Sequence, residues 1–256
     1  MDRRSLFGIA RSDSVASASP LIERLERFVT PTVIDAIAAE HRSGRRLYVG
    51  TTNLDAQNFT IWNMGAIANV GTPEAYELFR TVMLASASIP ILMPPVLFDV
   101  EVDGQQFDEM HADGGVQSQF FIPLQAINLP EAIATARANG FPGTPRPRMF
   151  VIRNAKFQPE PKSVDRNLTT MARRTISSLL QSMGRSDLYQ VFAVARARGN
   201  DIVYTEVPDS FIWNANQEFD GPEMRRLYAI GFEEGQKPEV WRRDLPGLFE
   251  ANTARQ

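Results

Sequence analysis

The side chains best suited to chemistry lie in one short run, DEMHADGG at residues 108–115. Four ionisable residues fall within six positions and two glycines follow them: Asp108, Glu109, His111, Asp113, Gly114 and Gly115. A glycine after an acid can take positive φ and lets another group come close to the carboxylate. The run therefore predicts that Asp113 is presented to a reacting partner at the rim of a cleft, with Gly114 or Gly115 at positive φ. Since Asp-Gly is also a common turn dipeptide, an ordinary polar turn is the alternative.

The histidines offer a second chemistry. His111 lies two positions before Asp113, so on a strand the two share a face, and with Glu109 they are candidate metal ligands. A catalytic metal site usually has three protein ligands with second-shell support, and His41 is the only other histidine in the chain. We therefore expect no metal and no cofactor. A serine–histidine–aspartate triad is also disfavoured, because His111 is too near Asp113 in sequence to be aligned by it.

Composition excludes several function classes. The 256-residue chain carries a formal charge of −3 and no basic run beyond Arg-Arg pairs, which does not suggest nucleic-acid binding. It contains no cysteine, no Gly-x-x-x-x-Gly-Lys loop, no Gly-x-Gly-x-x-Gly fingerprint and no Gly-x-Ser-x-Gly elbow. No apolar run approaches the roughly 18 residues of a transmembrane segment.

The elements that must position Asp113 can be read from local patterns. Asp103-Gly104 predicts a hairpin turn between a strand at 96–102 and a second strand near 106–111. Further strands are expected at 47–52, 59–62, 149–152 and 202–207. Helices begin at Ser19-Pro20, Thr30-Pro31 and Thr72-Pro73. Strands that alternate with helices, without a clear linker, predict a single α/β layered domain.

Three later helices complete the pattern. The longest is expected over 165–183, closed by Gly184, with its apolar stripe buried against the sheet: Leu168, Met171, Ile176, Leu179 and Leu180. A separate helix is expected over 188–197, and Asp220 with Glu223 predicts a capping box for the last one. His41 is predicted to be a surface residue that complements the dipole at the end of the second helix.

The order of these motifs resembles the second half of the patatin-like phospholipase domain. The matching segments are LASASIP at 84–90, the following Pro94-Pro95 and hairpin, and Asp113-Gly114-Gly115. TTNLD at 51–55 is similar to the core strand of that family, and VIRN at 151–154 and YAIG at 228–231 are similar to later elements. The resemblance implies a three-layer α/β/α fold with a central mixed sheet, N-terminally incomplete.

The same resemblance implies a lipid acyl hydrolase that uses a serine–aspartate dyad, with Asp113 as the acid and Gly114 and Gly115 supporting the turn. The glycine-rich oxyanion loop and the serine elbow of the family precede everything found here, so we expect the isolated chain to be inactive. Ser86 and Ser88 lack elbow glycines and are expected to be structural. The implied domain spans residues 19–240, between a polar lead-in at 1–18 and a tail at 241–256.

The implied partner is a lipid or another ester, with peripheral membrane contact left open and with no nucleic acid and no transmembrane segment. The compartment is not indicated. Two alternatives remain: a non-catalytic binding or scaffold protein on a degenerate patatin-like fold, and a metal-assisted hydrolase built on His111 and Asp113.

Overall fold

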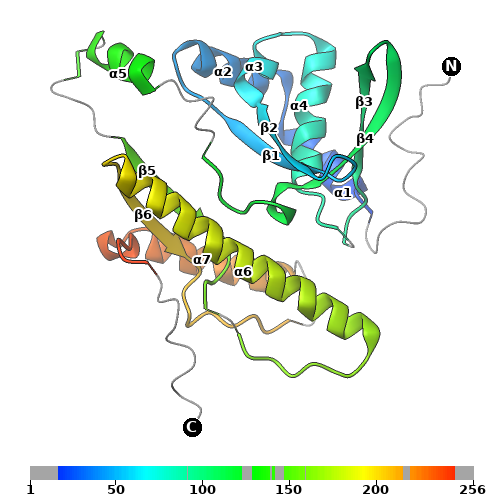
Figure 1. The fold of residues 1–256 in the computed structure, drawn as a ribbon, viewed down its shortest axis with the longest axis vertical. Helices are drawn as coiled ribbons and strands as arrows, with labels where there is room; N and C mark the ends of the chain where they lie inside the picture. Colours follow the sequence, from blue (N-terminus) through cyan, green and yellow to red (C-terminus); the bar gives the residue numbers. More distant parts are fainter. Residues whose placement is uncertain are drawn as a thin grey trace. The chain divides into compact units, whose positions relative to one another are not determined.

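The computed structural model describes residues 17–90, 92–122, 129–138, 140–141, 147–158, 160–215 and 220–245. Most of the predicted lead-in and of the predicted tail lies outside these residues. The chain forms two compact units (Figure 1). The N-terminal unit comprises Met1–Gln119 with Pro123–Ala132, and the C-terminal unit comprises Phe120–Ile122 with Ile133–Gln256.

The N-terminal unit is built on a four-stranded antiparallel sheet in the order β2-β1-β4-β3. Its strands are β1 (Tyr48–Asn53), β2 (Asn58–Asn63), β3 (Val96–Val102) and β4 (Gln105–Asp113). Its helices are α1 (Ser19–Phe28), α2 (Pro31–Arg42), α3 (Met64–Ala68) and α4 (Pro73–Ser86). Helix α4 packs against β1, β4 and β3.

Local capping and turn chemistry explain where these elements begin and end. The side chains of Thr30 and Thr72 accept hydrogen bonds from Val33 N and Ala75 N, and each is followed by proline at the first helical position. Asp103 and Gly104 both have positive φ, as a two-residue hairpin turn requires. The predicted hairpin is therefore confirmed, and its second strand continues to Asp113.

The core of the N-terminal unit lies between the helices and the sheet. Helix α4 contributes Phe79 and Val82, which are both fully buried. Strand β3 supplies Phe98, and α2 and α3 supply Ile34 and Met64. These side chains cover one face of the sheet that carries Asp113.

The C-terminal unit has a two-stranded parallel sheet of β5 (Arg148–Arg153) and β6 (Asp201–Glu206). These strands are joined through the 30-residue helix α6 (Leu168–Ala197), and α7 (Gly221–Glu234) follows. Its core is formed by Phe157, Leu188, Phe192 and Tyr204. Arg242 lies beside β6, because its backbone exchanges hydrogen bonds with the backbone of Tyr204. Helix α5 (Leu129–Ala138) lies in the sequence between the two sheets.

The prediction for the longest helix was wrong in two respects. Residues 165–183 and 188–197 do not form separate helices, because α6 runs through Gly184 without a break. The predicted stripe is not buried: Leu168 is 86% and Leu179 62% exposed, whereas Leu188 is 0% exposed. Figure 1 shows the reason, since the C-terminal half of α6 lies along β5 and β6 and its N-terminal half runs past the ends of the strands.

The α/β class expected from the alternating pattern is confirmed, with one antiparallel and one parallel sheet in the described residues. The single domain predicted over residues 19–240 stays a prediction. Among the described helices, none combines the length and the apolar character needed to cross a bilayer.

Candidate functional site

Asp113 is the last residue of β4 and is held by two segments that are distant in sequence. It pairs with Thr51 of the neighbouring strand β1. Its backbone N–H donates to the carbonyl of Ser88, just after α4, at 2.9 Å, and its carbonyl accepts from Thr52 Oγ1 at 2.9 Å. Since Thr52 and Ser88 are both buried, the backbone of Asp113 is fixed from two sides.

The carboxylate of Asp113 is partly buried and engages the turn that follows. Its Oδ1 accepts a hydrogen bond from the backbone N–H of Gly115 at 2.7 Å. Burial raises the pKa of Asp113 above its ordinary value, and the opposing effect of the Gly115 N–H is smaller. Within the described residues, Oδ2 makes no hydrogen bond and the carboxylate makes no ion pair. Asp113 thus combines raised basicity with one available oxygen.

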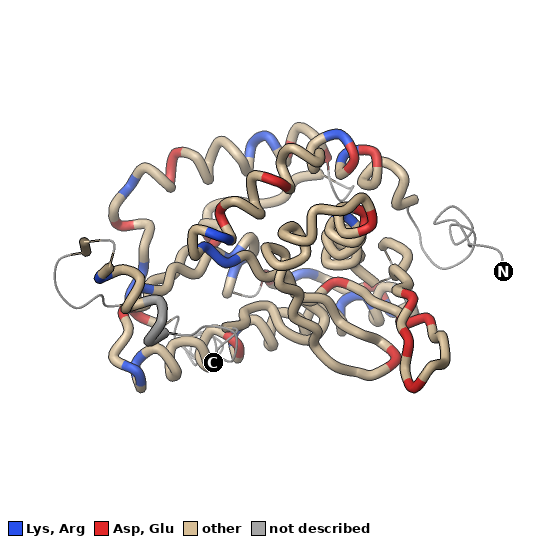
Figure 2. Tube along the Cα trace, turned by 90° about the horizontal axis from the view of Figure 1, so that it is seen from above, with Lys and Arg blue, Asp and Glu red and all other residues tan. Residues whose placement is uncertain are grey.

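The hairpin that leads to Asp113 is acidic. The β3–β4 hairpin carries Asp99, Glu101, Asp103, Asp108 and Glu109. Figure 2 shows acidic positions in red along a projecting loop. The sequence holds no lysine or arginine between Arg80 and Arg137. No neighbour in the sequence therefore offers the positive charge that would lower the pKa of Asp113.

We predict that the pKa of Asp113 is visible in the stability of the protein. A carboxyl whose pKa is raised on folding contributes stability below its unfolded-state pKa, and this contribution is lost as the pH rises through the folded-state pKa. The free energy of unfolding of the wild type, minus that of Asp113→Asn, should therefore fall as the pH rises through that range. Urea denaturation of both proteins between about pH 3 and pH 8 measures the difference. A difference that rises with pH would contradict the raised pKa.

Gly114 is required for close packing and neither glycine has positive φ, so the prediction of positive φ at Gly114 or Gly115 was wrong. Neither Gly114 nor Gly115 is among the positive-φ glycines of the described chain. Both belong to the 3₁₀ turn Gly114–Val116, which starts from Asp113 as its N-cap. A Cβ atom on Gly114 would lie 2.5 Å from the carbonyl oxygen of Gly50 and 3.1 Å from the ring of Phe59. Gly114 thus lets the turn lie directly against β1.

We expect Gly114→Ala to destabilise the N-terminal unit by about 1–3 kcal/mol or more, because backbone atoms cannot move aside as a flexible side chain can. Gly115→Ala is the matched control, since its Cβ would meet only the Asp113 carboxylate, with Oδ1 at 3.0 Å. Denaturation midpoints of the two variants provide the measurement. Equal losses of stability in the two variants would show that the contact between residue 114 and Gly50 does not cause the destabilisation.

His111 is part of a buried hydrogen-bonded network beside Asp113. It is 1% exposed and packs against the rings of Trp62 and Phe98. Its Nδ1 lies 2.8 Å from Thr51 Oγ1, which also accepts from Trp62 Nε1 at 2.8 Å, and its Nε2 lies 3.4 Å from Glu109 Oε2. Both ring nitrogens are therefore engaged within the protein.

This network gives the metal alternative no support. No group of three or more potential ligands of the His, Cys, Asp and Glu types is found in the described part of the chain. The Asp113 carboxylate accepts a hydrogen bond from the Gly115 N–H, whereas the ring nitrogens of His111 bond to the side chains of Thr51 and Glu109. The structure places His111 as a support for the two strands, and sequence spacing alone did not reveal that role.

The hydroxyls of the two candidate serines are both used structurally. Ser86 Oγ donates to the carbonyl of Gly50 at 2.8 Å, and Ser88 Oγ donates to the carbonyl of Leu84 at 2.9 Å with Ser88 fully buried. Neither hydroxyl bonds to Asp113. The expectation that these serines are structural agrees with their contacts.

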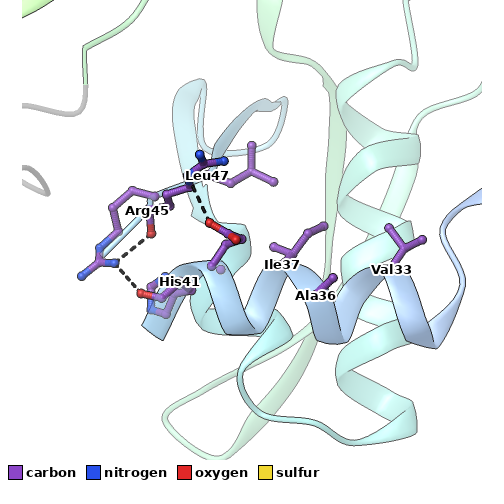
Figure 3. Close-up of a pocket in the computed structure, with 9 residues that line it drawn as sticks. Val33, Ala36, Ile37, His41, Arg45 and Leu47 are labelled. Carbon is purple, nitrogen blue, oxygen red and sulfur yellow. Dashed lines mark hydrogen bonds and ion pairs between the residues drawn. The ribbon is translucent and has the colours of Figure 1, made fainter. Parts of the chain in front are cut away.

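A pocket of about 370 Å³ lies elsewhere in the N-terminal unit, between α2 and the start of β1 (Figure 3). Val33, Ile37 and Leu47 form an apolar wall, and Arg46 Nη1 donates to the carbonyl of His41 at 2.9 Å. His41 lies in the last turn of α2 as predicted, but it is partly buried against Gly65 rather than on the surface. Burial and the charges of Arg46 and Arg42 lower its pKa. Asp113 does not line this pocket.

The N-terminal unit thus defines an α/β protein with an acid–glycine–glycine turn at the end of a central strand. Residues 2–125 match the sequence model of the patatin-like phospholipase family. The matched segment includes α1 to α4, the four-stranded sheet and the Asp113 turn, so the N-terminal half of the chain is similar to this family. A comparison with curated proteins gave no match.

Proposed function

We propose that the chain supplies the acid of a lipid acyl hydrolase, with Asp113 as the base of a serine–aspartate dyad. The observation that carries this proposal is the environment of Asp113. Its backbone is fixed by β1 and by the end of α4, its pKa is raised by burial, and one carboxylate oxygen is left available. A general base needs this combination of fixed position and raised basicity.

In this mechanism the carboxylate takes the proton from the serine hydroxyl as the serine oxygen attacks the ester carbonyl carbon. Collapse of the intermediate expels the alcohol, which receives the proton from Asp113, and leaves an acyl-enzyme that water hydrolyses. Backbone N–H groups would stabilise the oxyanion, a contribution of roughly 3–4 kcal/mol per donor. The glycines keep the turn compact beside Asp113.

Neither Ser86 nor Ser88 fits the role of the nucleophile. The chain contains no Gly-x-Ser-x-Gly motif, and the hydroxyls of Ser86 and Ser88 are bonded to backbone carbonyls. We therefore propose that the 256-residue chain is close to inert by itself. The serine and the oxyanion donors would come from sequence that precedes these residues.

The test compares the 256-residue chain with a longer protein from the same reading frame, where that frame continues upstream of Met1. Hydrolysis of p-nitrophenyl butyrate and labelling by a fluorophosphonate are measured for both. We expect hydrolysis and labelling in the longer protein only, with the label on a serine outside the present chain. Hydrolysis by the short chain, with the label on one of its own residues, would refute the proposed division.

A non-catalytic scaffold is the second candidate, and the structural use of Ser86 and Ser88 is the observation that favours it. It predicts that no upstream serine elbow is encoded and that neither protein is labelled. The same experiment therefore separates the two functions.

A further inference from the structure

The N-terminal half of α6 exposes apolar side chains to solvent instead of burying them. Leu168 is 86%, Met171 53% and Leu179 62% exposed. Two turns further on, the helix buries Leu188, Val191 and Phe192 in the core of the C-terminal unit. Large exposed apolar patches on a protein surface mark interaction sites.

The charge of the same segment has one sign. No aspartate or glutamate occurs between Asp165 and Asp187, whereas this stretch contains Arg166, Arg173, Arg174 and Arg185. A helix that carries arginines beside exposed leucine and methionine is typical of segments that lie at the surface of an anionic bilayer. This excess of positive charge indicates an anionic partner.

Two adjoining hollows give this surface a shape. An apolar hollow of about 520 Å³ is lined by Val164, Met171 and Leu179, together with Asp165, Arg166, Arg174 and Ser178. A polar hollow of about 300 Å³ is lined by Lys156, Arg174, Arg185, Ser178 and Gln181. Arg174 and Ser178 belong to both, so a cationic region passes directly into an apolar one.

The polar hollow has more positive charge than its one acid can balance. The Glu160 carboxylate, which also lines it, pairs with Lys156. Arg174 Nη2 donates to the backbone carbonyl of Glu160 at 2.7 Å. Among the described residues, neither Arg174 nor Arg185 forms an ion pair. Two guanidinium groups therefore remain for an anion.

A buried cation lies behind the hollow. Arg153 is 6% exposed, its Nη2 donates to Gln181 Oε1 at 3.0 Å, and its Nε and Nη1 have no hydrogen-bond partner in the described structure. Its guanidinium stacks over the ring of Phe157 at 4.2 Å. Glu206 is nearby, but its carboxylate is bonded to Arg242 and to the Phe157 N–H. Gln181 thus links the wall of the hollow to a further positive charge.

We propose that this surface, formed by the two hollows and the exposed side of α6 from Leu168 to Leu179, docks the protein on an anionic phospholipid bilayer. Phosphate headgroups bind at Arg174 and Arg185, while Leu168, Met171 and Leu179 enter the boundary between headgroups and acyl chains. The proposal does not depend on the role of Asp113, because it concerns binding to the bilayer and not hydrolysis.

The test measures binding of the wild-type chain to vesicles of phosphatidylcholine, with and without phosphatidylglycerol, by co-sedimentation. We expect binding to the anionic vesicles that weakens with salt, and little binding to phosphatidylcholine alone. The double variant Arg174→Gln/Arg185→Gln should bind about 20–30-fold more weakly, because each cation near an anionic surface contributes about fivefold. The pair Leu168→Gln/Leu179→Gln should lose the part of the binding that survives high salt.

The matched control is Arg24→Gln/Arg27→Gln, which removes the same charge from exposed positions of α1. It should bind like the wild type, and Arg166→Gln/Arg185→Gln is a second test pair if the first fails to fold. Equal losses in the control would overturn the proposal, since net charge alone would explain the binding. Saturable binding of inorganic phosphate without vesicles would also overturn the proposal, because it would indicate a soluble anion as the ligand. A dimer that is abolished by Leu168→Gln/Leu179→Gln would overturn it as well, because it would indicate a second copy of the chain as the partner.

Discussion

Ester hydrolysis by the active, longer protein should fall about 10²–10⁴-fold when Asp113 is replaced with asparagine. Asparagine keeps an oxygen that can accept the Gly115 N–H, so the turn is preserved. It places an NH₂ group where the serine proton must be received, and the serine then has no base. The kcat/KM for p-nitrophenyl butyrate measures the effect.

Asp108→Asn is the control for this variant, because Asp108 is an exposed acid on the same strand. It should leave the rate within about threefold of the wild type. Since burial raises the pKa of Asp113, wild-type activity should also decline, as the pH is lowered, at a pH above the ordinary aspartate range. Activity that survives in Asp113→Asn would assign the chemistry to another group.

The second large effect is expected in the C-terminal unit. Leu188→Ala should lower the free energy of unfolding by about 2–5 kcal/mol, because Leu188 is fully buried against the core and its removal leaves a cavity. Leu179→Ala, nine positions earlier on the same helix, should cost no more than about 0.5 kcal/mol. Urea denaturation followed by circular dichroism measures both.

This pair also tests the exposed surface of α6 in the absence of lipid. A loss for Leu179→Ala as large as that for Leu188→Ala would show that the N-terminal half of α6 is covered by protein in solution. The bilayer surface would then have to be reconsidered.

Sequence patterns predicted the features of this fold that are determined locally. The two-residue turn at Asp103-Gly104 and the threonine caps at Thr30 and Thr72 both depend on neighbours within a few positions. The chemistry of these residues is sufficient to specify the local backbone.

Sequence patterns failed to predict burial and backbone conformation where a segment that is distant in sequence determines them. The apolar period of α6 continues for its whole length, but the period cannot show where the sheet that should cover it ends. Likewise, two glycines after an acid suggested positive φ, whereas the contact of Gly114 with Gly50 follows from the pairing of β1 with β4. The contribution of Thr52 and Ser88 to the position of Asp113 was missed for this reason.

That pairing has a consequence for how the protein folds. The β1–β2 and β3–β4 hairpins close over short turns, but the hydrogen bond from Thr52 to the Asp113 carbonyl joins residues 61 positions apart. Long-range strand pairing is slow, because the entropy of closing a large loop is lost before the contacts form. The hairpins can therefore form early, while Asp113 acquires its final geometry only when β1 and β4 meet. During synthesis, the acid would be set in place only after the whole four-stranded sheet has left the ribosome.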